Sequence, residues 1–142
     1  MKDEYSYGVI PLRQDADGIK VLLILHKGGR HWAFPKGHKN LGETDYQAAQ
    51  RELKEETGLT ISQILNDLPY TESYRFYKFQ DKVCKTVSYY PAFVEGILKL
   101  QPEEIVDARW VALVDAARHL TFKEAREICS KVQALLSLKG MI

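Results

Sequence analysis

The sequence predicts an α+β fold, an α/β/α sandwich in which helices pack against a mixed β-sheet. Three observations support this fold class. Segments near the N-terminus and in the middle of the chain are rich in β-branched and aromatic residues, which favour strands. A segment that starts at Thr44 has the pattern of a helix N-terminus and is followed by a glycine. The C-terminal segment repeats its apolar residues with a helical period.

The central helix is the best defined element in the sequence. Thr44 and Gln47 match a capping box, with Thr44 as N-cap and Gln47 at the third helical position. The helix should run to about Thr57, and Gly58 is well placed to end it. The other expected elements are strands over 5–12 and 19–26 around a turn at 15–18, a loop over 27–38, hairpin strands over 70–79 and 83–94 around 80–82, a short strand over 108–111 and a helix over 125–138.

Length and composition limit the class of protein. The 142 residues are enough for a buried core, and we expect one domain over residues 1–142. The formal net charge of +1 gives no bulk electrostatic argument for a nucleic-acid or anionic-membrane partner. No apolar run could span a bilayer and the acidic N-terminus is unlike a secretory signal, so we expect a cytoplasmic protein. Cys84 and Cys129 lack metal-ligand spacing; we expect both to be reduced and one to be core, with a disulfide as the alternative.

Three glutamates of the central helix point to a cation. Glu52, Glu55 and Glu56 stand at positions i, i+3 and i+4, which share one helical face. On a helical wheel they lie beside the apolar side formed by Ala49 and Leu53, not opposite it. Like charges at this spacing destabilise a bare helix, and a hard divalent cation with oxygen ligands would relieve the repulsion. The alternative is a solvated acidic helix face.

The acidic residues belong to a longer pattern. It reads Gly37, five residues, Glu43, seven residues, Arg51-Glu52-Leu53, one residue, Glu55-Glu56, one residue, Gly58 and Leu59. This matches the complete Nudix box over residues 37–59, so the chain resembles the Nudix hydrolases. The resemblance implies the Nudix fold and hydrolysis of a nucleoside diphosphate linked to another group. Metal ions would neutralise the phosphates and lower the pKa of an attacking water.

The resemblance also implies roles for single residues. Mg²⁺ or Mn²⁺ would be held by Glu52, Glu55, Glu56 and the backbone carbonyl of Gly37, with Glu56 the least replaceable ligand. Glu43 would be supportive, or simply a carboxylate favoured by the helix dipole. Arg51 is expected to hold the carboxylates in place rather than to bind substrate. The expected catalytic residues are Arg51, Glu52, Glu55, Glu56 and Glu104.

Glu104 lies outside the box. It stands six residues before Trp110, at the place where the family commonly has an extra metal ligand or base. Its neighbour Glu103 stays open as an alternative, and so does an ordinary solvated loop.

Three further segments resemble the asymmetric diadenosine tetraphosphate hydrolases within the Nudix family. They are His31-Trp32-Ala33-Phe34-Pro35-Lys36-Gly37-His38, Lys85-Thr86-Val87-Ser88-Tyr89-Tyr90 and Leu120-Thr121-Phe122-Lys123-Glu124-Ala125. By this resemblance His31, Lys36 and Lys85 would contact the polyphosphate, whose charge requires cations beyond the metal ions. The alternatives are a loop histidine packed on Trp32 and, for Lys85, an ordinary exposed strand lysine.

Two aromatic residues are expected to sandwich an adenine. By the resemblance they are Tyr77, near the hairpin tip, and Phe122, at the start of the last helix. Stacking tolerates any base and can contribute about 1–3 kcal/mol per base. Tyr77 aligns only if one residue is inserted before Lys85, so the choice between Tyr74 and Tyr77 stays open. Phe122 as a core residue is the alternative.

The sequence thus predicts a metal-dependent pyrophosphate hydrolase that converts diadenosine tetraphosphate and water to ATP and AMP. The alternatives are an RNA 5′-pyrophosphohydrolase or another nucleoside-diphosphate hydrolase of this type and, from a different class, a non-catalytic nucleotide-sensing module. We expect a small-molecule substrate, no membrane partner, no nucleic-acid partner except RNA 5′ ends, and a monomer.

Overall fold

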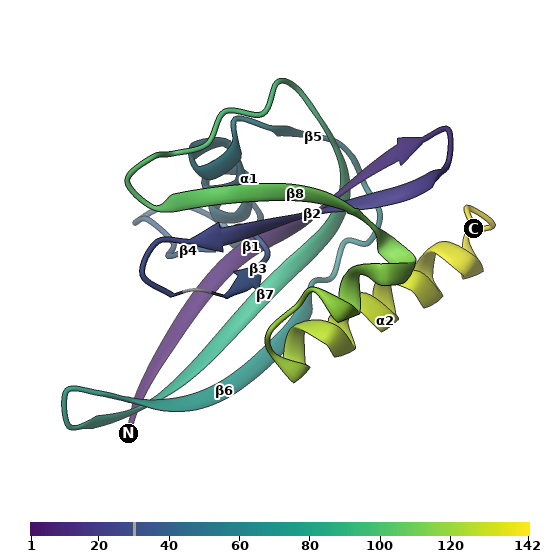
Figure 1. Ribbon diagram of the computed structural model, residues 1–142. Helices are drawn as coiled ribbons and strands as arrows, with labels where there is room; N and C mark the ends of the chain where they lie inside the picture. Colours follow the sequence, from purple (N-terminus) through teal and green to yellow (C-terminus); the bar gives the residue numbers. More distant parts are fainter. Residues whose placement is uncertain (30) are drawn as a thin grey trace.

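The computed structural model describes residues 1–29 and 31–142. Within these residues eight strands form one mixed sheet, in which the long strands β1 and β7 run parallel from the pair Lys2 and Val83 to the pair Leu12 and Phe93. The other pairs are antiparallel (Figure 1). The strands are β1 (Lys2–Asp15), β2 (Gly18–His26), β3 (Trp32–Ala33), β4 (Lys36–Gly37), β5 (Thr60–Ile64), β6 (Tyr70–Lys78), β7 (Asp81–Glu95) and β8 (Ile105–Ala112).

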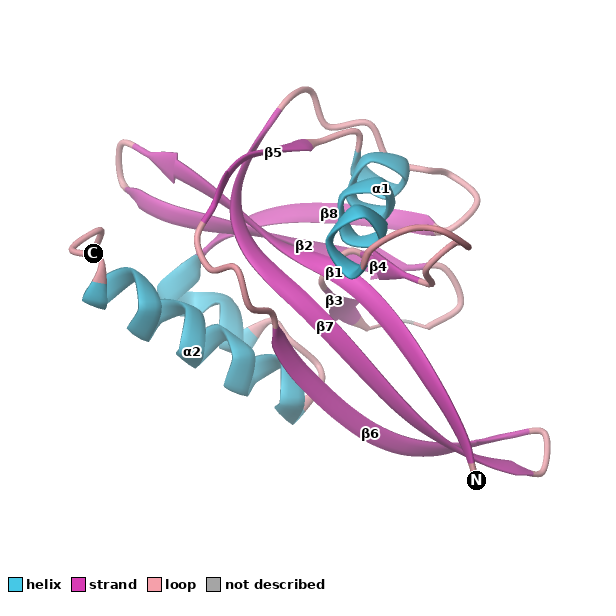
Figure 2. Ribbon diagram, turned by 180° about the vertical axis from the view of Figure 1, so that it is seen from behind, coloured by secondary structure: helices cyan, strands magenta, loops and turns pink. Residues whose placement is uncertain are grey.

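Two α-helices lie on opposite faces of the sheet (Figures 1 and 2). They are α1 (Asp45–Thr57) and α2 (Lys123–Leu138), and the short 3₁₀ helix η1 (Leu113–Arg118) precedes α2. Strand alternation sends Val9 toward α1 and Ile10 toward α2, so each face has its own apolar core. This arrangement confirms the predicted α+β class and the α/β/α sandwich.

The ends of α1 are formed as the sequence predicts. The Thr44 hydroxyl accepts from the N–H of Gln47, and the Gln47 side chain accepts from the N–H of Thr44. Gly58 ends the helix with φ +78°, in the left-handed region. The segment after β7 then returns to this end of the helix, where the N–H of Gln101 donates to the carbonyl of Glu56 over 3.1 Å. This contact brings the segment that carries Glu104 to the end of α1.

Some elements differ from those the sequence predicts. The turn expected over 80–82 lies instead at Phe79 and Gln80, where Phe79 adopts φ +56°. Strand β1 begins at Lys2 rather than at residue 5, because its N-terminal part pairs with the hairpin strand β7. Strand β5 is not expected, since its short, half-exposed sequence carries little pattern and its pairing with β7 forms it.

The structure also bears on the two cysteines and on membrane-spanning helices. Cys84 and Cys129 are free, and Cys129 lies on the buried face of α2, where burial raises the pKa of its thiol to about 12. No helix within the described residues has the length and apolar character needed to cross a membrane.

We predict that Gly58→Ala lowers the free energy of unfolding by roughly 2 kcal/mol, because a left-handed alanine is strained and its Cβ must also fit against neighbours. That Cβ would lie 3.0 Å from the Ile97 carbonyl oxygen and 3.2 Å from Lys99 Cβ. Gly140→Ala is the matched control, since Gly140 also has a positive φ (+72°) but has no neighbouring atom within 4 Å and lies near the chain end. Urea unfolding monitored by circular dichroism measures both, and equal losses would contradict the packing argument.

Candidate active site

The three glutamates of α1 differ sharply in exposure. The Glu55 side chain is 47% exposed and the Glu52 side chain 13% exposed. Glu56 is 1% exposed, under strand β4. The acidic face of the helix therefore turns from solvent into the protein within one helical turn, and the alternative of a solvated acidic face is wrong.

Arg51 holds the outer carboxylates and the loop before the helix. Its guanidinium donates to both oxygens of Glu43, at 2.7 and 3.1 Å, and to the His38 carbonyl at 2.8 Å. One of its nitrogens, Nη1, donates to Glu52 at 2.9 Å and to Glu55 at 3.1 Å. The bond from Arg51, followed by that from the Asn40 N–H, lowers the pKa of the Glu43 carboxyl. Arg51 thus contacts three carboxylates at once and positions two of the expected metal ligands.

Glu56 has no cationic side-chain partner within the described residues. Burial is the main cause that raises its pKa, to about 9, and the nearby carboxylates of Glu52 and Glu104 add to the shift. Two opposing contributions come from Lys36: a hydrogen bond of 3.3 Å from its backbone N–H to Glu56 Oε1, and the positive charge of its side chain. A buried carboxylate that faces two others is a place where a cation would be strongly bound.

Two glycines allow the backbone to approach this cluster. A Cβ on Gly37 would overlap the carboxylate of Glu52, and a Cβ on Gly8 would overlap the Pro35 carbonyl. Gly8 pairs with Lys36 across β1 and β4, so both glycines bring β4 against α1. The backbone of Gly37 is thereby brought next to the carboxylate of Glu52.

The expected metal ligands fit a hard divalent cation. They are carboxylates and a backbone carbonyl, the donor types that Mg²⁺ prefers. Within the described residues, no three acidic, histidine or cysteine side chains already converge as a metal-binding group, because Glu52 and Glu55 are turned to Arg51. Gly37, Glu52, Glu55, Glu56 and Glu104 would hold the ion, which would neutralise charge on a bound phosphate and activate a water.

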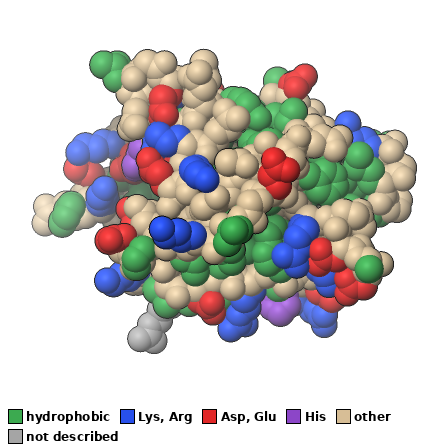
Figure 3. Space-filling view, turned by 90° about the horizontal axis from the view of Figure 1, so that it is seen from above, with side chains coloured by type: hydrophobic (Ala, Val, Ile, Leu, Met, Phe, Trp, Pro, Cys, Tyr) green, Lys and Arg blue, Asp and Glu red, His purple; other side chains and the backbone are tan. Residues whose placement is uncertain are grey.

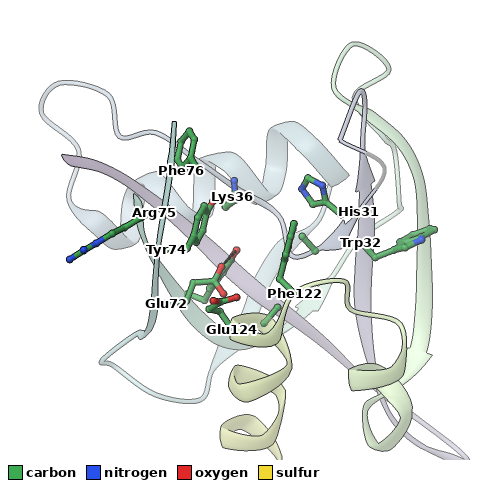
Figure 4. Close-up of a pocket in the computed structure, with 12 residues that line it drawn as sticks. His31, Trp32, Lys36, Glu72, Tyr74, Arg75, Phe76, Phe122 and Glu124 are labelled. Atoms are coloured by element: carbon green, nitrogen blue, oxygen red, sulfur yellow. Dashed lines mark hydrogen bonds between the residues drawn. The ribbon is translucent and has the colours of Figure 1, made fainter. Parts of the chain in front are cut away.

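A pocket of about 420 Å³ adjoins this acidic cluster, between β6 and the start of α2 (Figure 4). Tyr74 and Phe122 stand on two sides of it, and the carboxylates of Glu72 and Glu124 lie together beneath Tyr74, beside the first turn of α2. The side chain of Lys36 also lines the pocket, although its backbone N–H is bonded to Glu56. Lys36 therefore connects the pocket to the acidic cluster.

His31 and Phe122 lie together at one wall of the pocket. Their ring centroids are 5.0 Å apart in an edge-on arrangement, and His31 Nδ1 donates to the Gly29 carbonyl over 2.8 Å. The Trp32 N–H donates to the Thr121 hydroxyl over 3.3 Å and ties this loop to the start of α2. Phe122 is 51% exposed, so its alternative as a core residue is wrong.

Lys85 and Tyr77 do not line the pocket. Lys85 is 6% exposed, with its ammonium 3.8 Å from Glu4, so its alternative as an ordinary exposed lysine is wrong. Burial, followed by the charge of Lys36, lowers the pKa of Lys85. Tyr77 is 74% exposed near the tip of the β6–β7 hairpin, which extends away from the helices (Figure 1). Strand alternation directs Tyr74, not Tyr77, into the pocket.

Sequence reasoning missed three residues near the site. Glu72 shares the inward face of β6 with Tyr74, and this period-two pattern would have found it. Glu124 follows Phe122 by two residues, but only the structure shows that it faces Glu72. His26 ends β2 beside Lys36; burial lowers its pKa to about 4, and its Nε2 is buried with no hydrogen-bond partner among the described residues. A neutral His26 adds no positive charge beside Lys36.

We predict that the metal-free protein loses stability as the pH rises from about 4.5 to about 9, and that Glu56→Gln reduces this loss. The unfolded chain ionises Glu56 near the ordinary value of 4.5, whereas the folded protein keeps the proton up to about pH 9. Unfolding therefore releases a proton inside this window, which costs the folded state up to about 1 kcal/mol per pH unit. Urea unfolding in EDTA at several pH values measures the difference. Glu127→Gln should follow the wild type, and parallel curves for wild type and Glu56→Gln would contradict the burial argument.

The comparisons with known proteins agree with this geometry. The NUDIX domain family matches residues 3–131. The bis(5′-nucleosyl)-tetraphosphatase [asymmetrical] of Mus musculus is 33% identical over 118 residues, which cover 80% of this chain and 78% of the mouse protein. The protein of the same name from Caenorhabditis elegans is 32% identical over 132 residues, covering 92% and 94% of the two chains.

Two further matches cover much of the chain. The RNA pyrophosphohydrolase of a Nitratiruptor species is 31% identical over 121 residues, covering 77% of this chain and 76% of that protein. The crystal structure of the C. elegans Ap4A hydrolase superposes with a TM-score of 0.71 at 27% identity, covering 96% of this chain and 99% of the other. With the complete box over residues 37–59 and a family match over most of its length, this chain belongs to the Nudix family.

Proposed function

We propose that this chain, as one Nudix domain over residues 1–142, hydrolyses diadenosine tetraphosphate to ATP and AMP with Mg²⁺ or Mn²⁺. The observation that carries the proposal is the position of Lys36 between two chemically different sites. Its N–H bonds the buried Glu56, and its side chain enters a pocket with aromatic walls. A ligand that fits both would carry a base at one end and several phosphates beyond it.

The arrangement supports a role for each group in the reaction. A base stacks between Tyr74 and Phe122, while Lys36 and His31 receive the anionic phosphates. Lys85 contributes positive electrostatic potential to the phosphates but does not contact them, because it is buried against Glu4. Water attacks a phosphorus at the acidic cluster, the bond to the bridging oxygen breaks, and ATP and AMP leave.

Glu56, Glu52 and Glu55 are the proposed metal ligands, and Arg51 positions the last two. Glu104 acts as a further ligand or as the acceptor of the water proton. Of the neighbouring pair of glutamates, it is Glu104 whose charge affects the pKa of Glu56. This contribution favours Glu104 over Glu103.

An RNA 5′-pyrophosphohydrolase is the second candidate, supported by the Nitratiruptor relative. Its substrate is a long polyanion, which favours an extended basic surface. The net charge of this chain is +1, and on the face shown in Figure 3 the Lys and Arg side chains are interspersed with Asp and Glu side chains. This charge pattern favours a small substrate. A non-catalytic sensing module is disfavoured because every box carboxylate is present.

The first test is direct hydrolysis. We expect the protein with diadenosine tetraphosphate and magnesium to release ATP and AMP in equal amounts, resolved by ion-exchange chromatography. Glu56→Gln should lower kcat at least about 100-fold because it removes a charged ligand. Glu127→Gln, which removes an exposed carboxylate on α2, should leave the rate unchanged. Two molecules of ADP, no turnover, or full activity of Glu56→Gln would refute the proposal.

The second test separates the two tyrosines. We expect Tyr74→Ala to raise KM roughly tenfold or more, because loss of one stacking surface costs about 1–3 kcal/mol. Tyr77→Ala removes an exposed ring on the opposite face of the same strand and should change KM less than about twofold. Steady-state kinetics with diadenosine tetraphosphate measures both variants. The reverse ranking would assign the stacking role to Tyr77 instead.

A further inference from the structure

Two carboxylates meet at the inner end of the aromatic pocket. Glu72 comes from the inward face of β6 and Glu124 from the first turn of α2, and both are half-buried. Figure 4 shows them close together beneath the ring of Tyr74, beside the first turn of α2. Within the described residues neither is within 4 Å of a Lys or Arg nitrogen. The pocket is therefore apolar at its sides and anionic at its end.

Packing alone explains only part of this arrangement. The buried Tyr89 donates its hydroxyl hydrogen to Glu72 Oε1 over 3.4 Å, which is a long bond and uses one oxygen. Glu124 has no side-chain hydrogen bond among the described residues, and its charge, after burial, raises the pKa of Glu72. Two carboxylates held near one another at a cost in stability are suited to a ligand that brings hydrogen-bond donors between them.

A stacked base presents its edge to the end of its pocket. The exocyclic amine of adenine carries two hydrogens that point in different directions, and carboxylate oxygens accept such hydrogens. The carbonyl that replaces this amine in hypoxanthine is an acceptor, so carboxylates placed to accept from the amine would be repelled at that position.

We propose that Glu72 and Glu124 recognise the exocyclic amine of adenine and select amine-bearing bases over bases that carry a carbonyl at that position. This selectivity deepens the proposed function, on which it rests only for the choice of adenine as the base. Glu72 and Glu124 are thus specificity residues at the base end of the site, separate from the box carboxylates that serve the reaction.

Binding of AMP and IMP tests the proposal without turnover, because neither nucleotide contains a pyrophosphate bond. By isothermal titration calorimetry at one pH, we expect the wild type to bind AMP about tenfold more tightly than IMP. Glu72→Gln and Glu124→Gln each replace an acceptor by an amide that can donate to the IMP carbonyl, so the AMP preference should fall toward one. Glu127→Gln is the control for charge on α2 and should keep the wild-type ratio.

A purely structural role for Glu72 gives a different result. In that case Glu72→Gln would weaken AMP and IMP equally, and this outcome would overturn the proposal. Tyr89→Phe removes the hydroxyl but keeps Glu72, and we expect it to retain the AMP preference. If Glu72→Gln fails to fold, Glu124→Gln, on the surface turn of α2, still decides the question.

The binding and hydrolysis assays together distinguish a failure of this inference from a failure of the proposed function. If AMP is preferred and the two variants lose the preference, the inference stands even where diadenosine tetraphosphate is not hydrolysed. If diadenosine tetraphosphate is hydrolysed but AMP and IMP bind equally, or AMP does not bind, the inference fails and the proposed function stands.

Discussion

Burial of the Glu56 carboxylate is the constraint on which the rest of the site depends. A carboxylate at 1% exposure must accept a hydrogen bond or take up a proton, and the N–H of Lys36 supplies that bond. Strand β4 must therefore lie directly on α1. The approach is possible because Gly8 and Gly37 lack side chains that would overlap the Pro35 carbonyl and the Glu52 carboxylate. The two glycines are thus required for the close packing of β4 on α1 that buries Glu56.

Arg51 neutralises part of the negative charge of this cluster, but it does not contact Glu56. One guanidinium contacts the carboxylates of Glu43, Glu52 and Glu55, which offsets their mutual repulsion and anchors the loop before α1. It does not reach Glu56, so positive charge is deficient at the most buried acid. Glu56, the most buried acid of the helix, is therefore the carboxylate that a bound cation would stabilise most. An ion held by phosphate and protein together would supply this positive charge.

The elements that local sequence encodes were predicted well. The capping box at Thr44 and the left-handed Gly58 fix α1 through contacts within a few residues, so its bounds followed from the sequence alone. The pocket with aromatic walls did not, because it is built where β6, the loop near His31 and α2 converge. A shift of one residue in the hairpin alignment reverses the face of the strand to which a tyrosine points. The turn of the hairpin has a positive φ at Phe79, and because this residue is not a glycine the sequence does not indicate the turn. Glu72 and Glu124 are brought together only by tertiary packing.

The two ends of the site lie on different elements, and this separation bears on how substrate choice is set. Three of the expected metal ligands, Glu52, Glu55 and Glu56, are carried by α1, whereas the aromatic rings and the pocket carboxylates come from β6 and α2. Among the described residues that line the pocket, Lys36, in a strand of two residues, also bonds a carboxylate of α1. Under the proposed function, changes in β6 or α2 would therefore alter the base that is bound without disturbing α1. This fits the finding that relatives named for dinucleoside tetraphosphate and for RNA match the chain at similar identity, 33% and 31%. The box residues alone cannot distinguish these two substrate classes, so we expect the residues that line the pocket to do so.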